Sequence, residues 1–360
     1  MASIRDVAKH AGVSLATVSH VINGTKFVSE ELTKKVQNAI ITLGYQADPM
    51  ARGMRTGRSR LIGVLTADIS GLFYPYVIKG ICKIASANNY SITILDSGVT
   101  YNRPADVFQT EFNCLNSLMA NRVDGIIFAS SVAEGQTDKF LQDLRQKAAT
   151  YKQIALVSIE RDFSKYGVSS VFSDNTAGAA LAVNHLIDCG CKKIAHVAAP
   201  MGSQISQDRM DGYVKALKNA GHTINENMII HGDYSHQSGY KAMETLLANT
   251  PNIDGVFAAN DQMAMGVAGA IKKMGLNIPK DIKVIGFDNV FAASLVDPQL
   301  SSIHVRKKHM GERAAQMLIN KIEILDKGGK AETFREELET KLIIRKSTSI
   351  NPIEDWTMEE

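Results

Sequence analysis

The chain contains 360 residues, of which 45% are hydrophobic and 21% are charged, and this composition predicts a globular protein of two or three domains. Four cysteines are too few for a disulfide framework and lack zinc-site spacing, and no apolar run approaches the roughly 18 residues of a membrane span. The N-terminus enters an amphipathic segment directly, which excludes a secretory signal. We therefore expect a cytoplasmic protein with reduced thiols, no metal and no cofactor.

Charge is distributed unevenly along the sequence. Residues 1–60 contain nine Lys and Arg against four Asp and Glu, whereas the other 300 residues contain 31 against 33. The net charge of +3 therefore combines a basic N-terminal segment with a nearly neutral remainder. Such a segment is typical of a nucleic-acid-binding module.

The basic segment begins with three predicted helices. Apolar residues recur with helical spacing over residues 4–11, and Gly12 then supplies a tight turn. Ser14 is a good cap for a second helix that runs to about Asn23, and Ser29 can cap a third. Periodicity alone also fits a generic three-helix bundle, but the basic charge favours a helix-turn-helix, in which the second helix enters the DNA major groove. Its predicted outward face carries Leu15, Ala16, Thr17, Ser19 and His20, which can reach phosphates and base edges.

Residues 46–60 differ from both of their neighbours. They are basic, rich in glycine and short of large apolar side chains, and Pro49 opens a stretch that could form about two helical turns. Composition alone favours a flexible linker.

From Leu61 onward, short apolar runs alternate with amphipathic stretches. Strands are predicted to begin near residues 61, 91, 125, 154, 168, 193, 228, 255 and 283, with helices at 75–88, 105–121, 175–189, 206–220, 236–248 and 261–274. This alternation predicts βαβ units and parallel sheets, and the number of units exceeds one sheet. The common motifs of nucleotide-binding, hydrolase and metalloprotease sites are absent from the sequence, which favours a binding domain over a catalyst.

Polar residues follow several predicted strands. They include Glu160, Asn260 and Asp288. In an open α/β sheet, ligands bind beyond the carboxyl ends of the strands. Asp and Asn at such positions are also common helix caps, and capping is the favoured interpretation for Asp174, Asn175 and Asp261.

The string IRDVAKHAGVSLATVSHVING, followed by FVSEELTKKV and LGYQADPMARGM, closely resembles the DNA-binding head of the LacI/GalR family of bacterial transcriptional regulators. The resemblance continues to about residue 345. It implies an N-terminal all-α helix-turn-helix head at 1–46 and a hinge helix at 47–60. An α/β body of two periplasmic-binding-protein-like subdomains with parallel sheets follows at 61–345, and a tail at 346–360. The implied subdomains cover about 61–161 plus 292–324 and about 162–291 plus 325–345, joined by three crossovers.

The same resemblance implies two sets of site residues. The DNA-binding set contains Ser14, Leu15, Ala16, Thr17, Ser19, His20, Asn23, Arg52 and Met54. The effector-binding set contains Phe73, Tyr74, Glu160, Arg209, Tyr234, Asn260 and Asp288. An Arg fork and a carboxylate suit the hydroxyl groups of a small polar ligand, and aromatic rings suit its apolar face. Packing in the core remains an alternative for Phe73, as does a surface position for Arg209.

We therefore interpret the sequence as a transcriptional regulator that acts as a repressor. It would bind a pseudo-palindromic DNA operator as a homodimer and respond to a small sugar-like effector. Two alternatives use the same body: a solute-binding receptor, which would need an export signal, and a sugar-active enzyme, which would need a catalytic acid and base.

Overall fold

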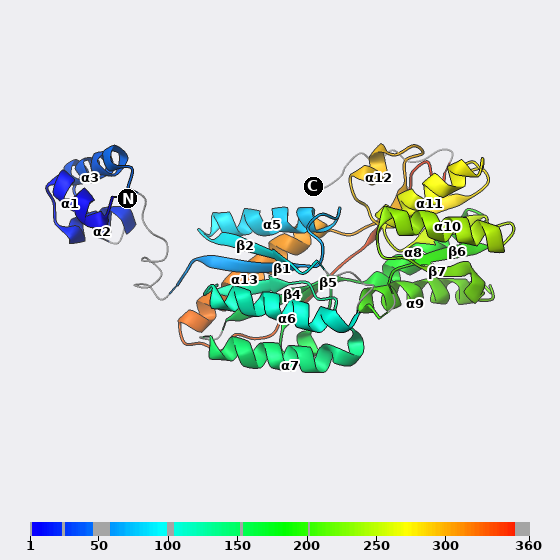
Figure 1. The fold of residues 1–360 in the computed structure, drawn as a ribbon, viewed down its shortest axis with the longest axis horizontal. Coiled ribbons are helices and arrows are strands. Elements are labelled where there is room, and N and C mark those ends of the chain that lie inside the picture. Colours follow the sequence, from blue (N-terminus) through cyan, green and yellow to red (C-terminus); the bar gives the residue numbers. More distant parts are fainter. Residues whose placement is uncertain are drawn as a thin grey trace. The chain divides into compact units, whose positions relative to one another are not determined.

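The computed structural model describes residues 2–23, 26–45, 58–98, 104–151, 154–200 and 202–349. The chain forms two compact units, Met1–Arg60 and Leu61–Glu360. Figure 1 shows their elements, and each unit is described by itself below.

Among its described residues, the first unit contains three helices, which bear out the helix-turn-helix prediction: α1 (Ile4–Ala11), α2 (Leu15–Asn23) and α3 (Glu30–Leu43). Helix α1 starts with a capping box, in which the Ser3 and Asp6 side chains each bind the other residue's backbone N–H. Gly12 then adopts a left-handed conformation with φ +66°, as the predicted turn requires. Ser29 precedes α3 as expected but makes no side-chain capping bond. The three helices close around a small apolar core of Val7, Ala8, Val18, Val36 and Ala39.

The second unit alternates strands and helices over most of its length. Its helices are α5 (Tyr74–Ala87), α6 (Pro104–Ala120), α7 (Glu134–Thr150), α8 (Asn175–Asp188), α9 (Gln204–Asn219), α10 (His236–Asn249), α11 (Asp261–Lys273), α12 (Ala292–Leu295) and α13 (Lys307–Asp326). Its strands are β1 (Leu61–Thr66), β2 (Ser91–Asp96), β3 (Gly125–Phe128), β4 (Ala155–Ile159), β5 (Ser169–Ser173), β6 (Ile194–Ala198), β7 (Ile229–His231), β8 (Gly255–Ala258), β9 (Lys283–Asp288), β10 (Ser301–His304), β11 (Arg335–Leu338) and β12 (Lys341–Ile343).

These strands form two six-stranded sheets, which define two lobes. The first lobe has the strand order β11-β5-β4-β3-β1-β2, and all of its pairs are parallel. The second has the order β12-β10-β9-β8-β6-β7, in which β12 is antiparallel and the other pairs are parallel. Parallel sheets need cover on both faces, which explains the near-continuous apolar runs in the strands.

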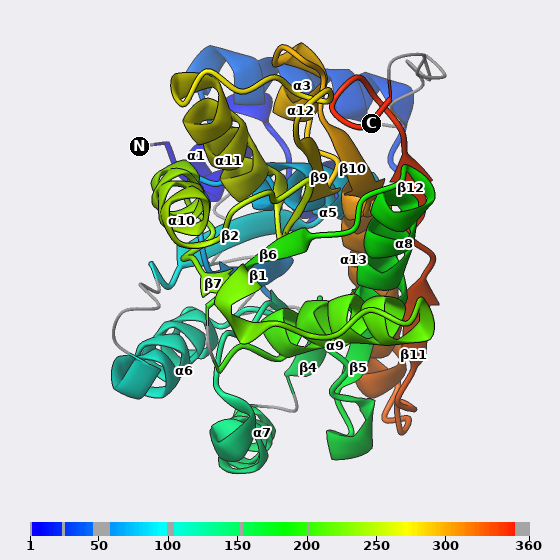
Figure 2. The same ribbon diagram turned by 90° about the vertical axis from the view of Figure 1, so that its right-hand side faces the viewer.

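Helices cover both faces of each sheet (Figures 1 and 2). In the first lobe, α5 and α13 pack on one face and α6 and α7 on the other. In the second lobe, α8 and α9 pack on one face and α10 and α11 on the other. The carboxyl ends of the central strands of both sheets meet the cavity described below.

Glycines allow close contact between neighbouring helices. A Cβ atom on Gly80 of α5 would lie 2.0 Å from the carbonyl oxygen of Lys308 in α13, and one on Gly311 would lie 2.0 Å from that of Val77. Gly239 of α10 and Gly266 of α11 make a similar pair in the second lobe. At these positions the helix backbones pack directly on each other.

The two lobes divide the chain differently from the subdomain limits that the resemblance implied. The expected limits gave β5 and β11 to the second subdomain, whereas both pair in the first sheet; β10, expected in the first, pairs with β9 in the second. The chain therefore crosses between the lobes after β5, β10 and β11. The physical reason is that β5 extends the first sheet beside β4 before the chain leaves it, so the loop at residues 160–165 is a turn within one lobe.

Candidate functional site

A cavity of about 360 Å³ lies between the two lobes, and this volume lies within the usual range for small-ligand sites. Its walls come mainly from segments that follow strands β1, β3, β4, β6, β7, β8 and β9. All seven side chains of the expected effector set line it: Phe73, Tyr74, Glu160, Arg209, Tyr234, Asn260 and Asp288. The structure thus brings together residues that are up to 215 positions apart in the sequence.

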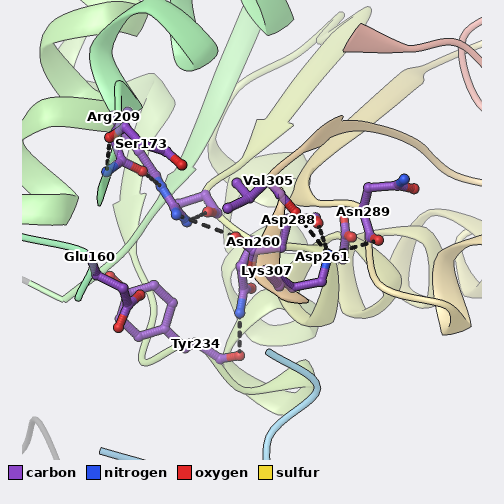
Figure 3. A network of polar contacts seen from close by, with 12 residues as sticks. Glu160, Ser173, Arg209, Tyr234, Asn260, Asp261, Asp288, Asn289, Val305 and Lys307 are labelled. Carbon is purple, nitrogen blue, oxygen red and sulfur yellow. Dashed lines mark hydrogen bonds and ion pairs between the residues drawn. The ribbon is translucent and has the colours of Figure 1, made fainter. Parts of the chain in front are cut away.

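Arg209 lies in α9 and is 5% exposed, so it is not the surface residue of the alternative interpretation. Its Nε donates to Asn175 Oδ1 at 3.0 Å, one terminal nitrogen donates to the carbonyl oxygen of Ala259, and the other lies 3.3 Å from Asp288 Oδ1 (Figure 3). The guanidinium carbon lies 3.9 Å from the centroid of the Phe287 ring. These contacts hold the guanidinium rigidly in the cavity wall.

Three of the cavity residues have positive backbone φ angles: Glu160 at +67°, Tyr234 at +70° and Asp288 at +101°. Residues other than glycine rarely adopt positive φ angles, and each residue held in this conformation costs about 1–3 kcal/mol of strain. Strained residues of this kind gather at ligand sites. The sequence contained no signal for these conformations.

Glu160 and Tyr74 form a short hydrogen bond in the wall of the first lobe. The Tyr74 hydroxyl donates to Glu160 Oε2 at 2.5 Å. Burial raises the pKa of Glu160 to about 7, although this hydrogen bond and the charge of Arg209 act in the opposite direction. Burial also raises the pKa of Asp288, against the lowering effects of Arg209 and Lys307.

Asn260 combines two roles that the sequence could not separate. Its Oδ1 accepts from the Met263 N–H, which caps α11, and its Nδ2 donates to the carbonyl oxygen of Tyr234 (Figure 3). Asp174 caps α8 as expected, but Asn175 binds Arg209 instead. Phe73 lines the cavity and also packs against the core, so the cavity position and the core-packing alternative both apply to it.

Lys307 binds the backbone of Asp288, and Asp261 binds the backbone that follows it. Asp261 is fully buried and accepts hydrogen bonds from Ser302 Oγ at 2.6 Å and Val290 N–H at 2.7 Å, so it braces the segment after β9 rather than capping α11. Lys307 Nζ donates to the carbonyl oxygens of Asp288 at 2.5 Å and Asn289 at 3.1 Å. Lys307 opens α13 of the first lobe, so it ties that lobe to a cavity residue of the second.

Ser130 and Ser131, which follow β3 and line the cavity, were not among the predicted site residues. The buried Glu111 carboxylate accepts from Ser130 Oγ and from the Ser131 N–H, both at 2.6 Å. The buried Arg161 guanidinium donates to the carbonyl oxygens of Ser130 and Val132. The two serines end the predicted strand GIIFASS, so the strand-end rule that selected Asp288 could have found them.

His196 of β6 predicts how stability depends on pH. Its ring is fully buried and stacks on Phe257 at 4.7 Å, and its Nε2 has no hydrogen-bond partner among the described residues. Burial lowers its pKa to about 4 from an ordinary value of 6.5. The unfolded chain therefore takes up the proton first as pH falls, and we expect this group to remove stability between pH 6.5 and 4, by at most about 1.4 kcal/mol per pH unit.

The variant His196→Phe keeps the stacked ring without the titrating group. As the pH is lowered from about 6.5 to 5, we expect its free energy of unfolding, measured with urea, to fall less than that of the wild type. Glu160 and Asp261 shift in the opposite sense, but they contribute equally to both proteins. Equal losses in the two proteins would contradict this account of His196.

The DNA-binding set lies on α2 and beside it. Val18 is buried, Ser14, Leu15 and Ala16 are exposed, and Thr17, Ser19 and His20 are half-buried. The Ser14 hydroxyl accepts from the Thr17 N–H at 3.1 Å and so caps α2. Asn23 ends the helix. Arg52 and Met54 lie outside the described residues.

In the part of the chain that the structure describes, no helix is long and apolar enough to cross a membrane, and no group of His, Cys, Asp or Glu side chains is arranged to hold a metal ion.

Two family models match the sequence. The model for bacterial regulatory proteins of the lacI family matches residues 3–48, and the model for a periplasmic binding protein-like domain matches residues 183–348. The first match covers the three helices of the N-terminal unit. The second begins within α8 and covers the rest of the second lobe together with α13 and β11 of the first lobe.

Curated relatives match over nearly the whole length. The chain is 33% identical over 357 residues to the HTH-type transcriptional repressor PurR of Photorhabdus laumondii, covering 99% of each chain. It is 32% identical over 348 residues to the ribose operon repressor of Halalkalibacterium halodurans, covering 97% of each.

Solved structures match as well. A lac repressor dimer bound to operator and the anti-inducer ONPF is 26% identical with a TM-score of 0.83, and the match covers 96% of this chain and 99% of that one. A complex of the transcriptional regulator CelR with cellobiose is 27% identical with a TM-score of 0.69, and the match covers 96% and 100%.

Proposed function

Because the chain belongs to the lacI family of bacterial regulatory proteins, we propose that it represses transcription from a two-fold symmetric operator and that a small polyhydroxylated effector controls its affinity. The protein is a DNA-binding transcriptional regulator and not an enzyme, as its curated relatives are transcriptional repressors. The observation that carries the effector proposal is the convergence of seven separated side chains on one cavity.

On the DNA side, α2 acts as the recognition helix. Its exposed N-terminal end presents Leu15 and Ala16 to base edges, and Ser14, Thr17, Ser19 and His20 supply hydroxyl and imidazole groups for phosphates and bases. The homodimer is supported by the similar lac repressor dimer bound to operator, because a symmetric dimer reads a pseudo-palindromic site. Asn23, Arg52 and Met54 complete the proposed interface, the last two within the segment 47–60 for which the family resemblance implies a hinge.

On the effector side, Arg209 and Asp288 of the second lobe hold the polar groups of the ligand, and Phe73, Tyr74 and Tyr234 pack on its apolar face. The similar regulator bound to cellobiose supports a sugar-like ligand. A ligand that bridges the lobes changes their relative orientation, and a coupling of about 1–3 kcal/mol would change operator affinity 5- to 150-fold.

The solute-binding receptor and the sugar-active enzyme do not fit a chain whose relatives are transcriptional repressors. We place the protein in the cytoplasm, where a DNA-binding regulator acts.

A sugar titration tests the effector site. In a thermal-shift screen of cellobiose and common monosaccharides, a ligand at 100 times its Kd is expected to add about 2.7 kcal/mol of stability. Asp288→Asn keeps the volume of the side chain but removes its charge, and it should weaken binding about 10- to 100-fold because it removes charge-assisted hydrogen bonds. Operator affinity without ligand should not change, since Asp288 belongs to the second unit.

Glu134→Gln is the matched control, because Glu134 is exposed and does not line the cavity. It should bind and respond like the wild type. If Asp288→Asn responds at the wild-type ligand concentration, the effector site lies elsewhere.

A further inference from the structure

The charges on the walls of the cavity are unbalanced. Four carboxylates line it, whereas Arg209 is the single cationic side chain among its described lining residues. The four carboxylates are those of Asp68, Glu160, Asp233 and Asp288. A ligand that enters this cavity meets a surplus of negative charge.

The single guanidinium does not offset that surplus for an incoming anion. Three of its five N–H groups already donate to protein acceptors, and its charge is paired with Asp288 at 3.3 Å. One of its faces is covered by the Phe287 ring at 3.9 Å. An anionic ligand would therefore have to compete with Asp288 for Arg209 while it faced the remaining carboxylates.

The two innermost carboxylates come from opposite lobes. Glu160 follows β4 in the first lobe, and Asp288 ends β9 in the second (Figure 3). Glu160 Oε2 accepts from Tyr74 and Asp288 Oδ1 accepts from Arg209, whereas their other oxygens, Oε1 and Oδ2, accept no hydrogen bond from the described residues. Burial, and to a smaller extent the neighbouring charge of Asp288, raise the pKa of Glu160, so the charge of Asp288 disfavours ionisation of Glu160.

Aromatic rings complete this environment. Phe73, Tyr74 and Tyr234 line the same cavity, and the rings of Phe73 and Tyr74 meet edge to face with centroids 5.4 Å apart. Aromatic faces attract cations through their quadrupole, and carboxylates beside aromatic rings are the groups that bind protonated amines. Rings and carboxylates therefore favour the same class of ligand.

We propose that the ligand of this cavity is a polyhydroxylated molecule that carries a protonated amine, and that its ammonium group binds between Glu160 and Asp288. This inference rests on the proposed effector site and specifies its ligand class. The ammonium group has three N–H donors and no acceptor, so it can satisfy carboxylate oxygens from both lobes at once. It thereby relieves their repulsion and draws the lobes together.

Hexoses and their amino derivatives test this proposal. Isothermal titration of the full-length protein compares D-glucosamine, D-galactosamine and D-mannosamine with D-glucose, D-galactose and D-mannose, and with glucose 6-phosphate and glucuronate. We expect at least one amino sugar to bind about tenfold or more tightly than its neutral parent. The phosphate and the uronate should not bind.

Glu160→Gln keeps the size of the side chain and its ability to form hydrogen bonds but removes its charge. In this variant the ratio of the affinity for the amino sugar to that for its neutral parent should fall to near one. Glu134→Gln removes the same charge from an exposed position of the first lobe and should keep the full preference. Binding of the neutral hexoses alone, or of the phosphate or uronate, would overturn the amine proposal and leave the effector site in place. Absence of binding by every sugar would contradict the effector proposal and the amine proposal together.

Discussion

Exchanging Leu15 and Ala16 for other small or polar side chains is expected to change which half-site the protein prefers. Both residues are exposed at the start of α2, the end of a recognition helix that contacts base edges. A mismatched base pair costs about 1–3 kcal/mol, so one changed contact should alter relative affinity about 5- to 150-fold. Competition binding between duplexes that differ by one base pair measures this effect at fixed salt concentration.

Lys34→Ala provides the control for that experiment. Lys34 lies in α3 and pairs with Glu30 at 3.1 Å on the exposed face, so its loss should change affinity for all duplexes alike or not at all. If replacing Leu15 and Ala16 weakens binding to every duplex by the same factor, α2 does not discriminate between base sequences.

Gly311→Ala is expected to destabilise the second unit by several kcal/mol. Its Cβ would lie 2.0 Å from the Val77 carbonyl oxygen, where α13 packs on α5, and the clashing atom belongs to a helix backbone that cannot rotate away. Separating the two helices would open the core that contains Val77, Ile81 and Met310, at a cost of about 2–5 kcal/mol on the scale of large core changes. Urea unfolding monitored by circular dichroism measures the loss.

Gly135→Ala is the matched control, because Gly135 also lies in a helix and a Cβ there would meet nothing within 4 Å. Alanine has the higher helix propensity, so this variant should be neutral or up to about 1 kcal/mol more stable. Similar stability of the two variants would show that α5 and α13 are not in backbone contact at Gly311.

Much of the architecture follows from local sequence patterns. The apolar runs of β1 and β2 and the apolar periodicity of α8, α10 and α11 predict these elements to within one or two residues. Strand β10 was not predicted as a separate strand, since SSIH is short and half hydroxyl. Both of its serines are buried in tertiary hydrogen bonds: Ser301 binds Arg345, Ser347 and Thr348 from the end of the chain, and Ser302 binds Asp261 and Asn289.

The cavity was predictable in part for a similar reason. Strand ends in parallel sheets converge, so polar residues directly after strands, such as Asp288 and Asn260, are brought together by topology. The supports of the site were not predictable. Glu111, Asp261 and Lys307 reach their partners from helices packed by tertiary contacts, and no local spacing marks those contacts.

Selection from a random duplex library shows whether the N-terminal unit of this protein recognises a two-fold symmetric DNA sequence. We expect the full-length protein to enrich two inverted half-sites, with specific binding about 10³ to 10⁷ times tighter than non-specific binding at physiological salt. The variant in which Leu15 and Ala16 are replaced should enrich a different half-site with the same symmetry. Enrichment of no common sequence, or of one without two-fold symmetry, would contradict recognition of a symmetric operator.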